Sequence, residues 1–459
     1  MKKRIAILLT AILAISLLLS TGTAETVEFT NTDLTASYDT SSATTIPFHG
    51  ETSDYTISAA GTYILSGTLN ATLIVEATNQ DKIQLVLNGL EINTTNGPAI
   101  YVKQADKVVL TLADGSVNTI RDGANYTLDE EGTNAAIYSK DDLSINGNGT
   151  LNLNGQTAHG IVSKDDLVIV SGNLNVTAVK DGLRGKDSLS IKNGNFVINA
   201  GSDGIVSTSE EVNLGNVYIE NGSFTIVSQR DGIEAKGTLT IVDGTYNITT
   251  ASDSVTSEDS LKGVKGGSNV LIKNGTFTLV TQDDAIHSNA DVTIENGTFT
   301  IQSGDDGIHA DGNVNIINGN IDIQQAVEGI EGFTVSIQDG TVNIVASDDG
   351  INATNGESTD GFNREAAQTG VHITINGGTV NVSSYNDSLD SNGDITINGG
   401  DVNLSIQNMG GGTGTLDANG SVNLNGGNVT TNDGGGIGGM GRPGGGFGGH
   451  GGGFGGGRR

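Results

Sequence analysis

A short sequence returns in this chain at a fixed distance. Residues 283–287 (DDAIH) recur 22 residues later as residues 305–309 (DDGIH), and residues 294–299 (IENGTF) lie between the two copies. A fixed period near 22 residues is typical of a solenoid, in which each unit buries its apolar face against the next unit instead of folding alone. The repeat therefore predicts a long structure built from stacked coils.

The intervening phrase also recurs, each time as an apolar residue, a turn with Asn-Gly or a similar pair, and a second apolar residue. Copies begin at Ile191, Ile219, Ile241, Ile272, Ile294, Ile316 and Ile337, and shorter copies begin at Ile375, Ile397 and Leu424. Alternation around Asn-Gly in isolation favours antiparallel hairpins, so an antiparallel sandwich is the alternative fold. Hairpins do not require a constant period, whereas coiled parallel strands about 4.8 Å apart do. We therefore predict an all-β parallel β-helix with coils of about 22 residues.

The chain divides into four segments. Residues 1–24 have a basic start, an apolar run of 15 residues and small residues for cleavage, which is the pattern of a secretory signal peptide. An uncleaved membrane anchor is the alternative, although the apolar run is shorter than the ~20 residues of a span. Residues 25–50 are predicted to cap the open sheet edge, residues 51–432 carry the repeats, and residues 433–459 form a Gly-rich flexible tail. We therefore expect a secreted monomer with no membrane span in the mature chain.

Charge and cysteine usage narrow the partners. The chain has no Cys, so disulfides do not hold it together. Removing residues 1–24 leaves 19 basic against 53 acidic residues, a net charge of −34. A chain this acidic repels nucleic acid and other anionic surfaces unless cations intervene. We expect no nucleic-acid partner.

Acidic residues stand at the corner before the apolar residue of successive coils. They are Asp181, Asp203, Asp231, Asp284, Asp306, Glu328, Asp349 and Asp387. Carboxylates stacked one coil apart repel each other, because screening over ~5 Å is incomplete. Between Asn274 and Gly441 the sequence has 22 acidic residues and one basic residue, Arg364, so we expect no neutralisation by protein cations. Oxygen ligands outside the cell favour Ca²⁺, and the alternative is that Asp-Gly is only good turn chemistry.

Two histidines follow the doubled acids at the same spacing. His287 comes after Asp283 and Asp284, and His309 after Asp305 and Asp306. Three interpretations stay open: the imidazoles cap a calcium site through water, ligate a softer metal, or simply stack as packed or exposed rings.

Several phrases in a fixed order resemble a known family. Residues 257–266, 283–289, 305–310, 328–332 and 348–353, followed by a loop and a Gly-rich C-terminus, resemble the bacterial carbohydrate-binding β-helix proteins that bind cellulose and polygalacturonate. The resemblance covers most of residues 50–450. It implies an extracellular right-handed parallel β-helix with bound calcium, similar in architecture to pectate lyases but binding polysaccharide rather than cleaving it.

The candidate calcium ligands follow from the acid pattern and this resemblance. They are Glu258, Asp259, Asp283, Asp284, Asp305, Asp306, Glu328, Asp348 and Asp349. An ion held by such residues would bridge the protein to the carboxylate of galacturonate. Neutral cellulose is harder to explain, because stacking on sugar rings usually uses exposed aromatic side chains. The chain has no Trp, and Tyr218, Tyr246 and Tyr385 are weak candidates.

Two other classes remain as alternatives. In a calcium-dependent pectate lyase, the ion acidifies the uronate and a neutral base removes the C5 proton. The sequence has no Lys after Lys273, which leaves Lys236, Lys262 and Lys265 nearby, and the candidate bases are Lys262 and Lys265. A glycosidase needs two carboxylates that face one cleft, and this chain offers too many pairs to choose one. A structural adhesin, which only displays a surface, is the third class; we favour a non-catalytic binding protein.

Overall fold

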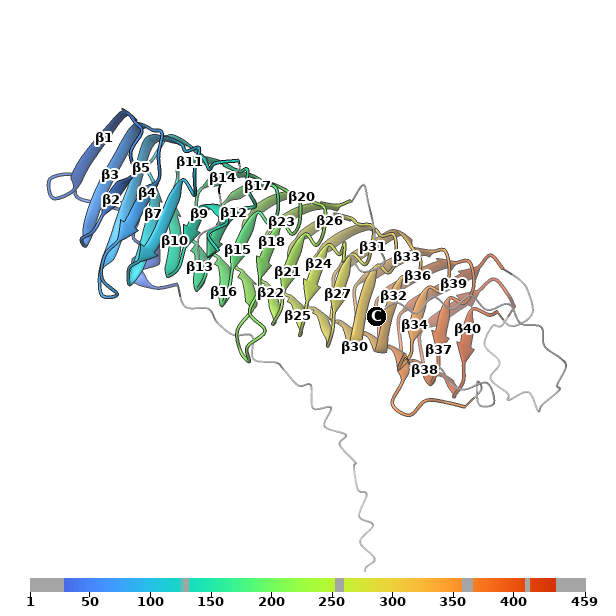
Figure 1. The fold of residues 1–459 in the computed structure, drawn as a ribbon. Coiled ribbons are helices and arrows are strands. Elements are labelled where there is room, and N and C mark those ends of the chain that lie inside the picture. The colour runs from blue at the N-terminus through green and yellow to red at the C-terminus, as the bar shows by residue number, and fades with distance from the viewer. Residues whose placement is uncertain are drawn as a thin grey trace, which may run out of the picture.

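A computed structural model describes residues 29–124, 126, 132–251, 260–356, 366–408 and 413–434. Within these residues the regular structure is strand, apart from the four-residue helix α1 (Asn31–Leu34), and the strand pairings are parallel. Figure 1 shows short strands stacked along one axis, from β1 at one end to β40 at the other. The predicted all-β class is confirmed, and the antiparallel alternative is wrong for the described part of the chain. The predicted signal peptide and residues 435–459 of the tail lie outside it.

Most strands pair with the third strand along the chain, so three successive strands form what we call a rung. The stacked rungs present three faces. The first face contains β2 (Tyr55–Ile57), β4 (Leu73–Glu76), β6 (Ile100–Gln104), β9 (Ala135–Ser139), β12 (His159–Ser163), β15 (Leu183–Gly185), β18 (Ile205–Ser207), β21 (Ile233–Ala235), β24 (Val264–Gly266), β27 (Ile286–Ser288), β34 (Ile351–Ala353), β37 (Leu389–Ser391) and β40 (Leu416–Ala418).

The second face contains β7 (Lys107–Leu112), β10 (Asp142–Gly147), β13 (Asp166–Ile169), β16 (Ser188–Ile191), β19 (Asn216–Ile219), β22 (Leu239–Ile241), β25 (Val270–Ile272), β28 (Val292–Ile294), β35 (His372–Ile375), β38 (Asp394–Ile397) and β41 (Val422–Leu424). The long strands β30 (Ile308–Ile316) and β32 (Ile330–Ile337) run across both the first and the second face.

The third face contains β8 (Val117–Arg121), β11 (Thr150–Gly155), β14 (Asn173–Ala178), β17 (Asn195–Ala200), β20 (Ser223–Ser228), β23 (Thr245–Thr250), β26 (Thr276–Val280), β29 (Thr298–Gln302), β31 (Asn320–Ala326), β33 (Thr341–Ala346), β36 (Thr379–Ser384), β39 (Asp401–Ile406) and β42 (Asn428–Thr431). The stack begins with β1 (Thr44–Glu51), β3 (Gly61–Leu69) and β5 (Lys82–Asn93), of which β5 pairs with both β7 and β8.

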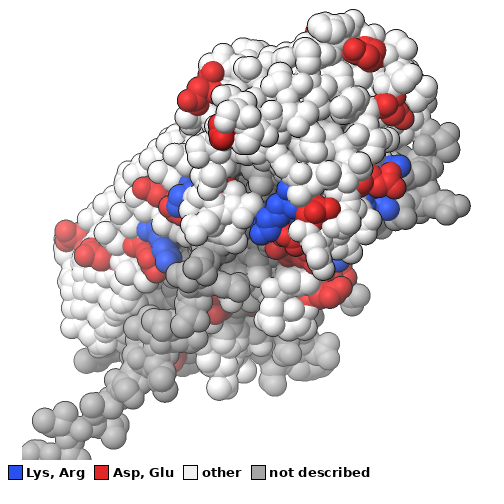
Figure 2. All heavy atoms as spheres, turned by 90° about the vertical axis from the view of Figure 1, so that its left-hand side faces the viewer, with Lys and Arg blue, Asp and Glu red and all other residues white. Residues whose placement is uncertain are grey.

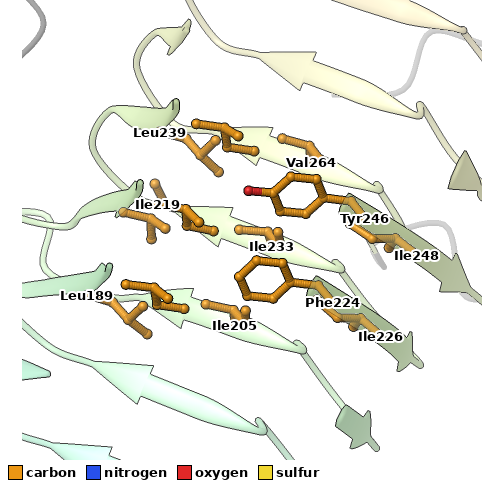
Figure 3. Packing of buried hydrophobic residues seen from close by; sticks show 14 of the residues in the cluster. Leu189, Ile205, Ile219, Phe224, Ile226, Ile233, Leu239, Tyr246, Ile248 and Val264 are labelled. Carbon is orange, nitrogen blue, oxygen red and sulfur yellow. The ribbon is translucent and has the colours of Figure 1, made fainter. Parts of the chain in front are cut away.

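Apolar side chains lie in columns inside the stack. Ile294 pairs with Ile272 on one side and Ile316 on the other, as the repeat predicts. A column of rings fills the adjacent space, and its members are Phe196, Phe224, Tyr246, Phe277 and Phe299, with centroids 4.6–4.9 Å apart. Figure 3 shows two of these rings beside the aliphatic columns. Burial of one such side chain contributes ~1.5–3 kcal/mol, so the repeated columns hold the rungs together.

Turns between the second and third faces use Asn-Gly for two separate reasons. Asn296 Nδ2 donates to Asn274 Oδ1 at 3.1 Å, so stacked turn amides bond from one rung to the next. Gly297 has φ +133°, and a Cβ there would meet the Phe299 ring at 2.9 Å and the Gly275 carbonyl oxygen at 3.0 Å. Only glycine fits this corner without strain.

The N-terminal segment packs along the stack as well as at its end. Strand β1 pairs with β3, whereas α1 lies beside β10. Asp33 of α1 is buried and contacts Lys107 Nζ at 2.7 Å. No helix of the described residues has the length and apolar content needed to cross a membrane.

Candidate functional site

Two columns of polar and charged side chains run side by side along the first face. The corner column begins with His159 at the start of β12 and continues in the turn before each later first-face strand as far as β37, with Asp181, Asp203, Asp231, Lys262, Asp284, Asp306, Glu328, Asp349 and Asp387. The strand column lies three residues further along each rung and contains Arg184, Val206, Glu234, Lys265, His287, His309, Glu331, Asn352, Asp390 and Asp417. Side chains of the two columns meet: Asp181 contacts Arg184 at 3.0 Å and Asp284 contacts His287 at 2.9 Å.

The backbone explains why acids recur at the corner. Asp284 Oδ1 accepts the Asp306 N–H at 3.1 Å, and Asp349 Oδ1 accepts the Asp387 N–H at 2.8 Å. A carboxylate therefore satisfies the corner N–H of the next rung, which is a structural role of the kind that turn chemistry predicts. Its second oxygen is free for another partner. The corner stays tight because the next residue is small: a Cβ on Gly329 would meet the Gly350 carbonyl oxygen at 2.4 Å.

Lysines neutralise the acids in the middle of the stack. Lys262 Nζ contacts Asp283 at 2.8 Å and Asp284 at 2.7 Å, and Lys265 Nζ contacts Asp231 at 3.2 Å and Glu234 at 3.1 Å. The prediction that protein cations leave the acids unpaired is therefore wrong for Asp283 and Asp284. It failed because Lys262 precedes the counted window in sequence and reaches these acids across neighbouring rungs.

The same contacts bear on the candidate lyase bases. Burial alone lowers the pKa of a lysine, but the paired carboxylates outweigh burial and raise the pKa of both Lys262 and Lys265. Both side chains are therefore ammonium groups at neutral pH. A proton-abstracting lysine has to be neutral, so this arrangement does not favour Lys262 or Lys265 as a catalytic base.

Two histidines continue the neutralised part of the columns. His287 Nδ1 lies 2.9 Å from Asp284 Oδ2, and His309 Nδ1 lies 3.2 Å from Asp306 Oδ2 and 3.6 Å from Asp284 Oδ2. Burial opposes charging of His309, but its bonds to the two carboxylates raise its pKa to about 11. We call the rungs from Asp231 to His309 the neutralised segment.

Beyond His309, which itself lies beside Glu331, the described residues give the acids of the two columns no Lys or Arg partner. The sequence has no Lys or Arg in residues 274–363. Burial and the adjacent Glu328 raise the pKa of Glu331 to about 9, and burial and Asp390 raise that of Asp349 to about 8. Burial with neighbouring acids also raises the pKa of Glu328 and Asp390 to about 7. We call Glu328, Glu331, Asn352, Asp349, Asp387 and Asp390 the uncompensated segment.

Asn352 is the distinctive member of this segment. It pairs with Glu331 on one side and Asp390 on the other, and its Nδ2 donates to Glu328 Oε2 at 2.9 Å. Its Oδ1 atom is buried and has no hydrogen-bond partner among the residues that the structure describes. A buried acceptor among carboxylates lacks a donor, and such an unsatisfied group costs about 1–3 kcal/mol. A cation at this point would satisfy Asn352 Oδ1 and the carboxylates together.

The predicted ligands fall into three groups. Glu258 and Asp259 lie outside the described residues. Asp283 and Asp284 belong to the neutralised segment, with Asp306 and the exposed Asp305 one rung further. Glu328, Asp348 and Asp349 lie in or beside the uncompensated segment, where Asp348 accepts a hydrogen bond from Asn386 Nδ2.

Sequence reasoning missed Glu331, Asn352 and Asp390. Each stands three residues after a predicted corner acid, as His287 and His309 do. This spacing could have identified them, because a residue three positions after a corner acid lies beside that acid on the first face. Among the aromatic candidates, Tyr246 is fully buried in the ring column, so it offers no platform for a sugar, whereas Tyr385 is exposed.

The end of the molecule nearest β1 has a different surface. Figure 2 views the stack from that side: most of the visible face is white, and blue basic side chains lie next to red acidic ones at several places across its middle. Ion pairs of the N-terminal rungs, such as Lys103 with Glu76 at 3.5 Å and Lys82 with Asp106 at 3.6 Å, agree with this picture. The unbalanced acids are concentrated toward the other end.

Fold and site together define an all-β protein of stacked parallel rungs with an acidic stripe that lacks basic partners over part of its length. A family model described as "Carbohydrate-binding domain-containing protein" matches residues 51–307 and 307–411. The chain therefore belongs to the carbohydrate-binding domain-containing protein family. The resemblance seen in the sequence is confirmed at that level.

Two known proteins show the extent of the similarity. A curated protein of the same description from Acetivibrio thermocellus is 36% identical over 126 residues, which cover 27% of this chain and 44% of that protein. The match therefore spans less than half of that relative. A polysaccharide lyase-like protein from C. thermocellum, solved as a gadolinium derivative, is 28% identical with a TM-score of 0.41, and the similarity covers 61% of this chain and 99% of the other.

Proposed function

We propose that the protein is a secreted, monomeric carbohydrate-binding protein, a right-handed parallel β-helix that binds acidic polysaccharide through Ca²⁺ held by the uncompensated segment. The observation that supports it most is Asn352 Oδ1, a buried oxygen to which no described residue donates, set among Glu328, Glu331 and Asp390. Family membership supports the carbohydrate. The signal-peptide pattern of residues 1–24 supports export.

The donor atoms of this segment suit calcium. Carboxylate oxygens and an amide oxygen are hard ligands, and Ca²⁺ takes six to eight of them in a flexible arrangement. The raised pKa values of Glu331 and Asp349 mean that these groups are costly to ionise without a counter-charge. A bound dication would remove that cost and hold Glu328, Glu331, Asp349, Asp390 and Asn352 Oδ1 together.

The bound ion also supplies the attraction that the protein alone lacks. A polyuronate and this chain are both anionic, and they repel each other without an intervening cation. Calcium keeps coordination positions that uronate carboxylates are able to fill. Polygalacturonate is therefore the proposed substrate class, and neutral cellulose is expected to bind more weakly.

Binding is favoured over cleavage for one structural reason. The two candidate bases within the acidic stripe, Lys262 and Lys265, are each held by two carboxylates and carry raised pKa values. They stabilise the stripe and are poorly suited to accept a proton from a substrate carbon. We therefore propose a non-catalytic role.

A pull-down on insoluble pectin, cellulose and chitin, repeated with Ca²⁺ and with chelator, tests this function. The mature chain should be retained on pectin with Ca²⁺ and released by chelator. Asn352→Leu should lose most of the retention, because it removes the amide oxygen that would bind the ion while it keeps a similar side-chain volume. Asp401→Asn, which removes one exposed acid of β39 on the third face, is the matched control and should bind normally. Retention that ignores the chelator, or release of unsaturated uronate from pectin, would contradict the proposal.

A further inference from the structure

The neutralised segment contains a second cluster whose chemistry differs from that of the uncompensated segment. Strands β27 and β30 place His287 directly beside His309, and the two rings are 5.0 Å apart at an interplanar angle of 75°. Asp284 lies three residues before His287. One ligand atom from each of Asp284, His287 and His309 lies within 4.8 Å of the other two.

The distances among these atoms match a small tetrahedral ion. Asp284 Oδ2 lies 2.9 Å from His287 Nδ1 and 3.6 Å from His309 Nδ1. Ligands about 2.0–2.2 Å from a zinc ion at tetrahedral angles are roughly 3.3–3.5 Å apart. The two measured separations fall on either side of that range, so small side-chain shifts would complete the geometry.

The His287 ring is oriented by a hydrogen bond on its far side, and an acid lies near the corresponding nitrogen of His309. His287 Nε2 lies 2.9 Å from Asn289 Oδ1, and His309 Nε2 lies 3.7 Å from Asp311 Oδ1. When an ion displaces the protons at Nδ1, the N–H that remains at Nε2 faces these oxygens and the Nδ1 lone pair faces the cluster. A metal-binding histidine usually has this outer partner, which fixes its tautomer.

Asp284 is held in place in the same way. Its Oδ1 accepts the Asp306 N–H at 3.1 Å, and its Oδ2 accepts a bond from Lys262 Nζ at 2.7 Å. Lys262 also contacts Asp283 at 2.8 Å, so it keeps a partner when Asp284 Oδ2 turns toward an ion. With neutral imidazoles, Asp283, Asp284 and Asp306 together with Lys262 carry a net charge of −2, which a dication cancels.

We propose that Asp284, His287 and His309 form a binding site for a zinc-like transition-metal dication, with Asp306 beside His309 as the fourth ligand. Two imidazole nitrogens favour zinc, copper or nickel over calcium, which prefers oxygen. The site adjoins the proposed calcium segment, because Glu331 lies beside His309 and Asp306, but the two sites use different ligands. The rival arrangement is a pair of imidazolium ions held by Asp284 and Asp306 without a metal.

Calorimetric titration of the mature chain with Zn²⁺ in excess Ca²⁺ tests the site, because the calcium keeps the oxygen-only segment from competing. We expect one zinc ion per chain, and an intense visible d–d absorption when Co²⁺ replaces it. His309→Gln should weaken zinc binding by about 100-fold or more. His372→Gln, on β35 of the second face, is the matched control and should bind like the parent chain.

Folding of each variant is checked by its far-ultraviolet circular dichroism and its melting temperature, so that loss of zinc is not confused with loss of structure. Asn289→Leu provides a second variant that leaves all four ligands in place. It should weaken zinc binding by about 10–100-fold through loss of the ring's outer partner. No zinc binding by the parent chain, or equal binding by the His309→Gln variant, would overturn the proposal. Pectin retention in the pull-down is unaffected by either result, so the two proposals fail independently.

Discussion

The neutralised and uncompensated segments share one backbone but differ in charge balance. In both, a corner acid accepts an N–H of the next rung, as Asp284 and Asp349 do. In the neutralised segment, Lys265 lies over Asp231 and Glu234. In the uncompensated segment, Asn352 occupies the equivalent place over Glu328 and Glu331. The fold dictates where the carboxylates stand, and a single neighbouring residue decides whether they need an external cation.

Magnitudes show why that neighbour matters. Two unit charges ~5 Å apart at an effective dielectric constant near 20 interact by roughly 3 kcal/mol. A stack of carboxylates therefore has to be protonated, paired with a protein cation, or bridged by a metal ion. Lys262 and Lys265 provide the second solution. Asp203, whose pKa burial and its acidic neighbours raise to about 7, shows that the neutralisation is incomplete even beside Asp231.

Removing a lysine from the neutralised segment should have the largest effect. Lys262→Met leaves Asp283 and Asp284 without their ammonium partner, and the side chain of Asp284 is only 3% exposed. Breaking a buried pair from one side typically costs about 3–5 kcal/mol. Denaturant unfolding should show a loss of that size. Lys192→Met, which breaks the more exposed pair with Glu220, should cost less than about 1 kcal/mol. Equal losses in the two variants would mean that burial of the pair does not matter.

Adding calcium should stabilise the uncompensated segment by a somewhat smaller amount. A ligand at 100 times its Kd adds about 2.7 kcal/mol to the free energy of unfolding. The melting temperature of the mature chain should therefore rise with Ca²⁺ and return to its starting value with chelator. The Asn352→Leu variant should respond much less. A melting temperature that is the same with Ca²⁺ and with chelator would count against calcium in the structure.

Exchanging one residue between the segments should convert one into the other. Asn352→Lys places an ammonium group between Glu331 and Asp390, where Lys265 stands in the neutralised segment. A hydrogen bond to a charged group contributes about 1.5–3 kcal/mol, so the metal-free variant should unfold at higher denaturant concentration. Its response to Ca²⁺ should disappear. A variant that is stabilised but still responds to calcium would place the ion elsewhere.

The smallest effect expected is a pH dependence that belongs to the uncompensated segment. The pKa of Glu331 is about 9 and that of Glu328 about 7 in the folded chain, above the ~4.3 of an unfolded glutamate. Between these values the folded state holds more protons than the unfolded state, so stability falls as pH rises. In chelator, the melting temperature should decrease from pH 5 to pH 9.

Two comparisons assign that slope to its source. Glu331→Gln should flatten it, because the amide does not ionise. Ca²⁺ should also flatten it, since the ion favours the charged carboxylates. His309, with its pKa raised to about 11, also makes stability fall as the pH rises above 6.5. The quantity to measure is therefore the difference in slope between the Glu331→Gln variant and the parent chain. If the melting temperature falls equally with pH in the two chains, Glu331 does not cause the pH dependence.

Much of the architecture was readable from the repeats. The positions of Ile272, Ile294 and Ile316 predicted which residues lie in register, and the structure places them so. The corner acids were found because Asp-Gly recurs before the apolar residue. Glu331, Asn352 and Asp390 were missed because they differ in residue type, although they share one spacing. Lys262, the partner of Asp284, was missed because the charge count began at Asn274. In the stack this lysine lies only one rung before Asp284.

The period, the apolar columns and the excess of acid were all predictable, because they depend only on residue type and spacing along a regular stack. Which carboxylates are paired became known only from the folded arrangement. Pairing depends on side-chain reach across rungs, where residues such as Asn352 and Asp390 become direct neighbours although 38 residues separate them in the chain. The same stacking that repeats the backbone brings different side chains together on each rung, and so gives neighbouring parts of one stripe different chemistry.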